Sequence, residues 1–292
     1  MASVAIGICT RDRPDELADT LASIARSSVP VSHVVVSDDG IGERAAHVCT
    51  AAPIDVDYLR GPRRGLAPNR NHLLNVVDED FVVFIDDDCL LGVSFLEAAM
   101  DCMERAEHSN GRGRVIVTGT ETNRGNLVRA AAQTFLGFQA RPYDPEETMT
   151  SIVINATLFP RSLFAEHTFD EQIRYGYEEV DLASRAVRTG YTITQCDQAI
   201  NDHRPSELSR HDYESVMVAS RLFVTFKRYA LTEHRYGHAT AFAVIAPLHA
   251  IGAGTKADGV RGAWGAVRAI WRAGRYLLAH SRGARHAVAS LP

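Results

Sequence analysis

The sequence predicts an α/β protein with a mostly parallel central sheet flanked by helices, followed by a helical carboxyl-terminal extension. Apolar runs of strand length alternate with segments of helical periodicity up to residue 205. The run 81–85 is apolar at every position, as expected when helices cover both faces of a central strand. After residue 205 strand signals stop and the pattern becomes helical and basic. We therefore expect a domain over residues 1–205 and a helical region over 206–292.

The elements follow in order along the chain. Pro14 suits the first position of a helix, and Leu17, Leu21 and Ile24 recur at helical spacing after it. Gly190 is a stop signal for a later helix. Strands are predicted over 3–9, 33–36, 56–59, 81–85, 115–118, 151–156 and 191–196, and helices over 14–27, 69–77, 94–107 and 178–189. A glycine- and arginine-rich turn is predicted over 109–114, and residues 119–150 form an irregular excursion.

Composition excludes several classes of protein. With 292 residues and 46% hydrophobic content, the chain can bury a substantial core, which excludes disorder over most of its length. The net charge of -5 gives no general attraction to phosphate backbones, so no nucleic acid partner is expected. The 5 cysteines are widely spaced and lack a C-x-x-C pair, which argues against disulfides and structural zinc.

Neither a leader nor a membrane span is predicted. The first apolar run, residues 4–9, is followed at once by Arg11, Asp12 and Arg13, unlike a secretory signal. The stretch 239–254 contains Pro247 and is shorter than the roughly twenty residues that span a bilayer. A cytoplasmic location is the expectation.

Three consecutive acids, Asp86, Asp87 and Asp88, follow the most convincing strand. Ligands collect at the carboxyl ends of strands in open α/β sheets, and clustered carboxylates repel one another unless a cation intervenes. Oxygen ligands on a sharp turn suit Mg²⁺ or Mn²⁺. A solvated loop or a helix cap is the alternative interpretation.

Two further segments belong to the same edge of the predicted sheet. Asp38 and Asp39 follow the strand 33–36 and can accept hydrogen bonds from a ribose or base, although Asp-Gly is also a common turn. The segment 61–71 (GPRRGLAPNRN) offers glycines and the arginines Arg63, Arg64 and Arg70 as phosphate partners, or else is an ordinary loop with solvated arginines. It lacks the lysine and hydroxyl residue of a Walker loop.

Together these motifs resemble the family 2 nucleotide-sugar glycosyltransferases of the GT-A (Rossmann-like) fold. The resemblance covers residues 3–205 and rests on ICTRDRPDELADTLASI, VVVSDDG, GLAPNRNHLL, FVVFIDDDCL and GYEEVDLASRAVRTGY, in that order. It implies a nucleotide-binding part over 1–110 and an acceptor-side part over 111–205. The implied donor is a nucleoside-diphosphate sugar, and the implied acceptor is a hydroxyl of a glycan, lipid or natural product.

The resemblance also assigns site residues. It implies that Asp86 and Asp88, the ends of a D-x-D motif, bind Mg²⁺ or Mn²⁺ with His203. Arg70 is expected to face the diphosphate, and Asp39 the base or ribose. The full set implied for the nucleotide is Thr10, Arg11, Arg13, Asp38, Asp39, Arg70 and Asp87.

The later motif of the family usually reads glutamate-aspartate, and its second acid is taken as the general base. Here the pair is Glu178-Glu179, so Glu179 has the base position with a longer side chain, and Asp181 competes with it. An acid that only complements the helix dipole is the alternative. The resemblance thus implies an inverting, metal-dependent transfer in which metal and Arg70 stabilise the leaving diphosphate and a carboxylate deprotonates the acceptor.

Other functions are compatible with parts of the pattern. A sugar-phosphate nucleotidyltransferase also needs a nucleotide and a metal, but usually has an early glycine-rich loop with a lysine, which is missing here. An aspartate-nucleophile phosphatase normally has threonine or valine where Leu90 stands. A noncatalytic nucleotide-sugar binding protein would not need acids at all these positions.

The carboxyl-terminal region is locally basic. Segment 256–285 holds Lys256, Arg261, Arg268, Arg272, Arg275, Arg282 and Arg285 against a single acid, Asp258. Trp264 and Trp271 fall in a helical pattern flanked by these arginines. The segment is either an ordinary helix packed on the domain or an amphipathic helix on an anionic membrane, which would place the protein at the inner face of that membrane.

Overall fold

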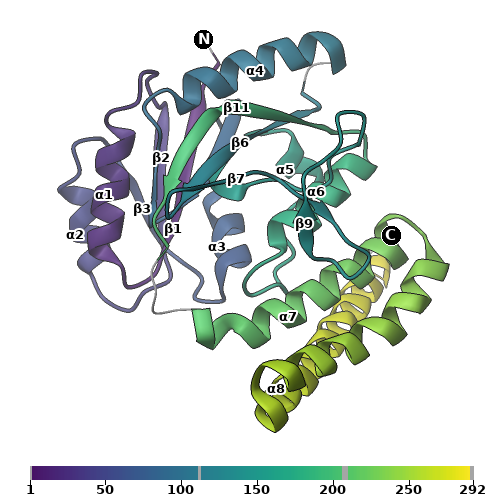
Figure 1. Ribbon diagram of the computed structural model, residues 1–292. Coiled ribbons are helices and arrows are strands. Elements are labelled where there is room, and N and C mark those ends of the chain that lie inside the picture. Colours follow the sequence, from purple (N-terminus) through teal and green to yellow (C-terminus); the bar gives the residue numbers. More distant parts are fainter. Residues whose placement is uncertain (1, 111–112, 206–209, 290–292) are drawn as a thin grey trace.

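A computed structural model describes residues 2–110, 113–205 and 210–289 of the chain (Figure 1). Its strands are β1 (Val4–Thr10), β2 (His33–Asp38), β3 (Asp57–Arg60), β4 (Phe81–Asp86), β5 (Cys89–Leu90), β6 (Val115–Asn123), β7 (Asn126–Val128), β8 (Ala132–Gln133), β9 (Gln139–Arg141), β10 (Thr157–Pro160) and β11 (Thr192–His203). The α-helices are α1 (Pro14–Ile24), α2 (Arg44–Thr50), α3 (Leu66–Leu73), α4 (Phe95–Asn110), α5 (Leu163–Glu166), α6 (Glu178–Arg188), α7 (Arg210–Lys227) and α8 (Tyr236–Ala289). A 3-10 turn, η1 (Ile154–Ala156), and a π-helix, η3 (Arg228–Thr232), complete the set.

The central sheet is mixed. Its order is β3-β2-β1-β4-β10-β6-β11-β5, with β7 paired to β6. The strands from β3 to β4 are parallel, as predicted, whereas β10 runs antiparallel to both of its neighbours. The predicted α/β architecture with a helical extension is confirmed, with a larger antiparallel share than expected.

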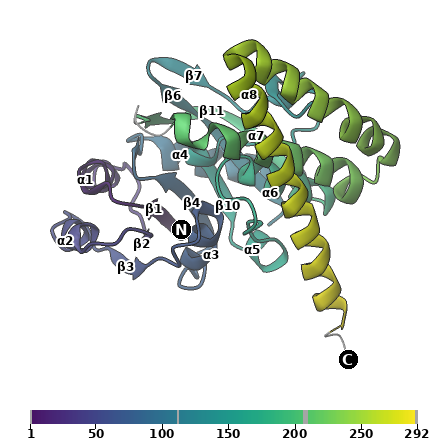
Figure 2. The ribbon, with the colours of Figure 1, turned by 90° about the horizontal axis from the view of Figure 1, so that it is seen from below.

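Helices cover both faces of the sheet (Figures 1 and 2). Alternate residues of β1 point to opposite sides, so Ile6 and Ile8 pack with α1, α2 and α4, whereas Ala5 packs with α3, α5 and α6. Both clusters consist of buried apolar side chains, most of them aliphatic or aromatic. This two-layer burial fixes the sheet and therefore the positions of the strand ends.

The helical extension packs onto the domain through its own core. Helices α7 and α8 bury apolar side chains against Ile173 and Val180, which belong to the domain. Helix α8 breaks at Asp258 and Gly259, whose backbone angles are not helical, so it forms two arms. Gly254 and Gly262 lie so close across the break that a Cβ on either would meet the other's carbonyl group. No helix within the described part of the chain combines the length and apolar content that a bilayer span needs.

Several predicted boundaries are wrong for identifiable reasons. The strand predicted over 151–156 is a loop ending in η1, because the chain turns there to aim Asn155 at Asp86; the strand β10 follows it. The helix predicted over 69–77 begins earlier, at Leu66, after Gly65 with a φ of 109°, and ends at Leu73. Helices α2 and α5 were not predicted.

Other elements extend beyond their predicted ends. The strands predicted over 115–118 and 191–196 continue to Asn123 and, through a bulge, to His203. The predicted excursion 119–150 contains the rest of β6 and the short strands β7, β8 and β9. Residues 111–112 of the predicted turn, and residues 206–209 at the predicted domain boundary, lie outside the described residues.

Candidate active site

The carboxyl ends of β1, β2 and β4 meet at one edge of the sheet. Parallel pairing sets Cys9 beside Asp86 and Thr10 beside Asp38. The short strand β5 pairs antiparallel with the end of β11, which sets His203 opposite Cys89. A histidine distant in sequence from the triple aspartate thereby lies next to it.

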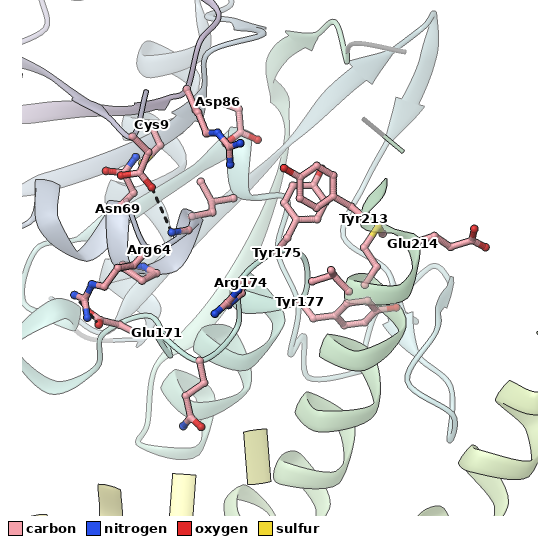
Figure 3. A pocket seen from close by; sticks show the side chains of 18 of the residues that line it. Cys9, Arg64, Asn69, Asp86, Glu171, Arg174, Tyr175, Tyr177, Tyr213 and Glu214 are labelled. Atoms are coloured by element: carbon pink, nitrogen blue, oxygen red, sulfur yellow. Dashed lines mark hydrogen bonds and ion pairs between the residues drawn. The ribbon is translucent and has the colours of Figure 1, made fainter. Parts of the chain in front are cut away.

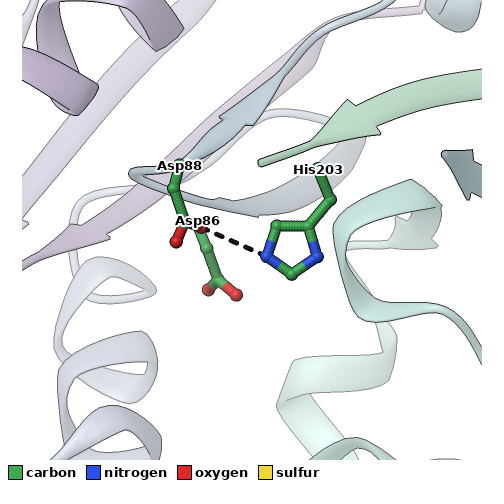
Figure 4. A group of neighbouring side chains, drawn as sticks. All are labelled: Asp86, Asp88 and His203. Atoms are coloured by element: carbon green, nitrogen blue, oxygen red, sulfur yellow. Dashed lines mark ion pairs between the residues drawn. The ribbon is translucent and has the colours of Figure 1, made fainter. Parts of the chain in front are cut away.

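Asp86, Asp88 and His203 form a compact group of possible metal ligands (Figure 4). One ligand atom from each residue lies within 4.8 Å of the others. The His203 Nε2 atom is 3.2 Å from an Asp88 carboxylate oxygen. Two carboxylates and one imidazole are a donor set that suits Mn²⁺ or Mg²⁺, so these residues fit the predicted ion chemically.

Further acids and an amide surround this group. His203 Nδ1 lies 3.1 Å from Glu121, so the ring bridges Glu121 and Asp88. Burial disfavours the imidazolium, but the hydrogen bonds to both acids outweigh it and raise the pKa of His203 to about 10. Asn155 donates to Asp86 at 3.3 Å and accepts from the Asp86 backbone N–H at 2.9 Å. The Asp86 carboxylate is thus fixed by a neighbouring side chain, as carboxylates that bind metals commonly are.

Arg70 is buried and joins two acids. One guanidinium nitrogen lies 2.7 Å from Glu178 and another lies 2.9 Å from Asp86. Burial disfavours the cation, but the charges of Asp86 and Glu178 outweigh it and raise the pKa of Arg70. Arg70 is not among the residues that line the cleft described below. Its contacts therefore position Asp86 and the amino terminus of α6.

Asp87 lies between β1 and the metal group. Its carboxylate accepts from the Thr10 hydroxyl at 2.8 Å and lies 3.2 Å from Arg13, which also contacts Asp88 at 2.7 Å. Burial raises the pKa of Asp87 to about 7, despite the opposing effects of Thr10 and Arg13. Thr10, Arg13 and the acids therefore form one connected group at this edge of the sheet.

The two acids that follow β2 differ in their surroundings. Asp38 is buried, and its oxygens accept from the Gly40 N–H at 2.7 Å and the Tyr58 hydroxyl at 2.9 Å. Asp39 instead lines the cleft and accepts from the Arg63 N–H at 2.8 Å. Asp38 shapes the turn, whereas Asp39 faces the space that a ligand would occupy.

A broad, open cleft of about 2290 Å³ runs from this edge of the sheet to the helical extension (Figure 3). Cys9, Thr10, Arg11 and the triple aspartate line one end, and residues of α7 and α8 line the other. Figure 3 shows Tyr175, Tyr177 and Tyr213 along one wall, and the rings of Tyr175 and Tyr213 lie 4.6 Å apart. The cleft is large enough for a nucleotide sugar together with a second substrate.

Glu179 and Asp181 lie on the first turn of α6 in different environments. Glu179 is partly buried next to Glu178, and burial followed by the charge of Glu178 raises the pKa of Glu179 to about 8. The Gln139 side chain donates a hydrogen bond to Glu179. Asp181 is fully buried; Lys227 lies 2.9 Å and Arg185 lies 2.8 Å from its oxygens. Neither acid lines the cleft, but Tyr177, which precedes α6, does.

Sequence reasoning missed the residues that reach the site from irregular segments. Glu121 and Asn155 belong to stretches that were predicted as an excursion and as a strand. Lys227 lies in the helical extension, and it pairs with Asp170 at 2.6 Å as well as with Asp181. The sequence signal that could have indicated Lys227 is a lysine at the end of the largely apolar stretch 222–226.

Comparison with solved structures supports the fold. A mannosyltransferase from Pyrobaculum calidifontis, PcManGT in complex with GDP-Man and Mn²⁺, is 14% identical with a TM-score of 0.60, covering 98% of this chain and 81% of that chain. GalNAc-T7 with UDP, GalNAc and Mn²⁺ is 13% identical with a TM-score of 0.60, covering 83% and 56%. The architecture is thus the GT-A fold that the motifs implied.

Sequence comparison identifies the family. The succinoglycan biosynthesis protein ExoM of Rhizobium meliloti (strain 1021) is 36% identical over 90 residues, which span 28% of this chain and 29% of that protein. The family model for glycosyl transferase family 2 matches residues 5–168, a segment that includes the triple aspartate and the arginine that holds it. The chain therefore belongs to glycosyl transferase family 2.

Proposed function

We propose that the protein is an inverting, metal-dependent glycosyltransferase that moves a sugar from a nucleoside-diphosphate sugar to an acceptor hydroxyl. The observation that carries the proposal is the grouping of Asp86, Asp88 and His203 at the end of the cleft, in a chain of this family. The presence of GDP-Man with Mn²⁺ in one structural neighbour, and of UDP with Mn²⁺ in another, supports a nucleotide-sugar donor.

The donor would lie along the carboxyl edge of the sheet. Thr10, Arg11, Arg13 and Asp39 line the cleft there and supply hydrogen-bond donors, acceptors and positive charge for the nucleotide. Asp86, Asp88 and His203 would hold Mn²⁺ or Mg²⁺, which when bound would neutralise charge on the departing diphosphate. Arg70 would act by holding Asp86 in place rather than by contact with the donor.

Glu179 is the proposed base. The acceptor oxygen attacks the anomeric carbon opposite the leaving group, and its proton passes to the Glu179 carboxylate. The bond from the anomeric carbon to the diphosphate oxygen breaks, and the electron pair leaves with the nucleoside diphosphate. We assign the role to Glu179 because both oxygens of Asp181 are held by cations.

Product analysis tests the proposal. With a sugar nucleotide, Mn²⁺ and an acceptor, a transferase releases a nucleoside diphosphate and gives an inverted anomeric configuration by NMR. A nucleotidyltransferase would instead form or consume pyrophosphate, and a binding protein would give no turnover. Asp88→Ala should abolish metal-dependent transfer, so unchanged turnover in that variant contradicts the proposal.

Residues 1–205 would then form the catalytic domain, with the donor bound by 1–110 and the acceptor by 111–205 and the helical region 206–292. We also propose that α8 contacts an anionic membrane from the cytoplasmic side. Val244, Leu248 and Trp264 are largely exposed, Trp264 by 63%, and the exposed cations Lys256 and Arg261 lie close to them in sequence.

Vesicle binding tests the membrane contact. The full chain should cosediment with vesicles of phosphatidylglycerol and phosphatidylcholine more than with phosphatidylcholine alone, and added salt should weaken that binding. Leu248→Ser with Trp264→Ser should reduce it. Equal binding to both vesicle types, or full binding by the double variant, would contradict the contact.

A further inference from the structure

Arginines of the second arm of α8 line the same cleft as the triple aspartate. Arg268, Arg272 and Arg275 contribute from this arm, and Arg174 contributes from the loop before α6. Figure 3 shows the Arg174 side chain inside the cleft, beside Tyr175 and Tyr177. We call these four residues the arginine cluster. It comes from elements other than the strand ends that hold Asp86 and Asp88.

The arginine cluster concentrates positive charge in one part of the cleft. Its helical members stand at i, i+4 and i+7, so they share one helix face and repel one another. Within the described part of the chain, none of the four guanidinium groups lies within 4.0 Å of an acid. Arg64, on the opposite wall, is by contrast paired with Glu171 at 3.1 Å. The cluster thus presents positive charge that an anion could neutralise.

Tyr276 lines the cleft together with the arginine cluster, one helical turn after Arg272 and next to Arg275 in sequence. The charges of Arg272, Arg174 and Arg275 all act on the Tyr276 hydroxyl, opposing the effect of burial on its pKa. The Tyr276 oxygen is buried and has no hydrogen-bond partner among the described residues. Arginine side chains that line the same part of a cleft supply several N–H donors and positive charge, which suit the oxygens of a phosphate or diphosphate.

An apolar surface adjoins the cluster. The Arg275 guanidinium lies 4.9 Å from the centre of the Trp271 ring, and Trp271 is 65% exposed although it lines the cleft. Leu278, one further turn along the arm, also lines the cleft and is exposed. A ligand that binds here meets positive charge and apolar side chains together.

We propose that the arginine cluster binds a phosphate or diphosphate group of the acceptor, and that the acceptor is a phosphorylated amphiphile whose apolar part contacts Trp271. This inference rests on the proposed function, because it names the acceptor class of the same cleft. The donor diphosphate lies at the strand ends, so the two phosphate groups occupy opposite ends of the cleft.

Binding of octyl diphosphate tests the inference. The chain has 2 tryptophans, so Trp264→Phe leaves Trp271 as the sole fluorescent reporter of its kind. Octyl diphosphate should change its emission, and octanol at equal concentration should not. Arg174→Gln with Arg272→Gln should weaken binding by about tenfold or more. Arg44→Gln, which changes an exposed arginine of α2 outside the cleft lining, is the matched control and should leave binding within about twofold.

Competition separates the acceptor site from other phosphate sites. Saturating nucleoside diphosphate with Mn²⁺ should not displace octyl diphosphate if the cluster belongs to the acceptor. Displacement, or loss of nucleotide affinity in the double arginine variant, would assign the cluster to the donor and overturn the inference. Equal binding of octanol and octyl diphosphate would also overturn the inference. So would a protein that binds anionic vesicles but does not bind octyl diphosphate. If the double arginine variant still hydrolyses the nucleotide-sugar donor at the parent rate, the proposed function stands even when the inference about the acceptor is wrong.

Discussion

The proposed base gives the sharpest prediction, an acid limb in the pH profile of kcat/KM. With a pKa of about 8, Glu179 is ionised in about 3% of molecules at pH 6.5 and in about half at pH 8. The rate should therefore rise about fifteenfold over this interval, because only the carboxylate can accept the acceptor's proton. A glutamate with the ordinary pKa of 4.5 would give a flat profile over the same range.

Initial rates at saturating Mn²⁺, measured from pH 6 to 9.5, provide the assay. Glu179→Gln should lower the rate by about 10²- to 10⁴-fold and remove the limb. Gln139→Ala removes a hydrogen bond that favours the carboxylate, so the limb should move to higher pH without being lost. A profile that is the same in Glu179→Gln as in the parent chain would refute the assignment of the base.

Two other predictions concern the supports of the site. Lys227→Met leaves Asp170 and Asp181 as buried acids without their shared cation. Chemical denaturation should therefore show a loss of about 3–5 kcal/mol in the free energy of unfolding. A loss below about 1 kcal/mol would contradict this prediction. Asn155→Ala removes the side chain that holds the Asp86 carboxylate. The Mn²⁺ concentration that gives half-maximal transfer should therefore rise about 10- to 100-fold. An unchanged concentration would show that Asn155 does not orient Asp86.

The sequence predicted the parallel half of the fold because its local signals agree with its packing. The run 81–85 is apolar on both faces and lies at the centre of two helical layers. Helix α1 begins at Pro14, as predicted, because the fixed φ angle of proline suits the first position of a helix. Boundaries failed where tertiary contacts decide the backbone, as at Asn155, whose place in a turn is set by Asp86.

The candidate site was predictable where a motif ends a strand. The family resemblance implied that Asp86, Asp88 and His203 share one metal ion, and their ligand atoms lie together. Their partner Glu121 was not predictable, because β6 extends to it only through pairing with the end of β11. The pairing of Asp181 with Lys227 joins the domain to its helical extension, and no local pattern encodes such a contact.

Metal-dependent nucleotide binding tests the central claim most directly. Thermal unfolding with UDP or GDP, with and without Mn²⁺, should show stabilisation by one nucleotide only when Mn²⁺ is present, by about 2.7 kcal/mol at a hundredfold excess over Kd. Asp88→Asn should lose this stabilisation, and Glu104→Gln, an exposed acid on α4, should keep it. Metal-independent stabilisation, or full stabilisation of Asp88→Asn, would show that the acids at the sheet edge do not form the donor site.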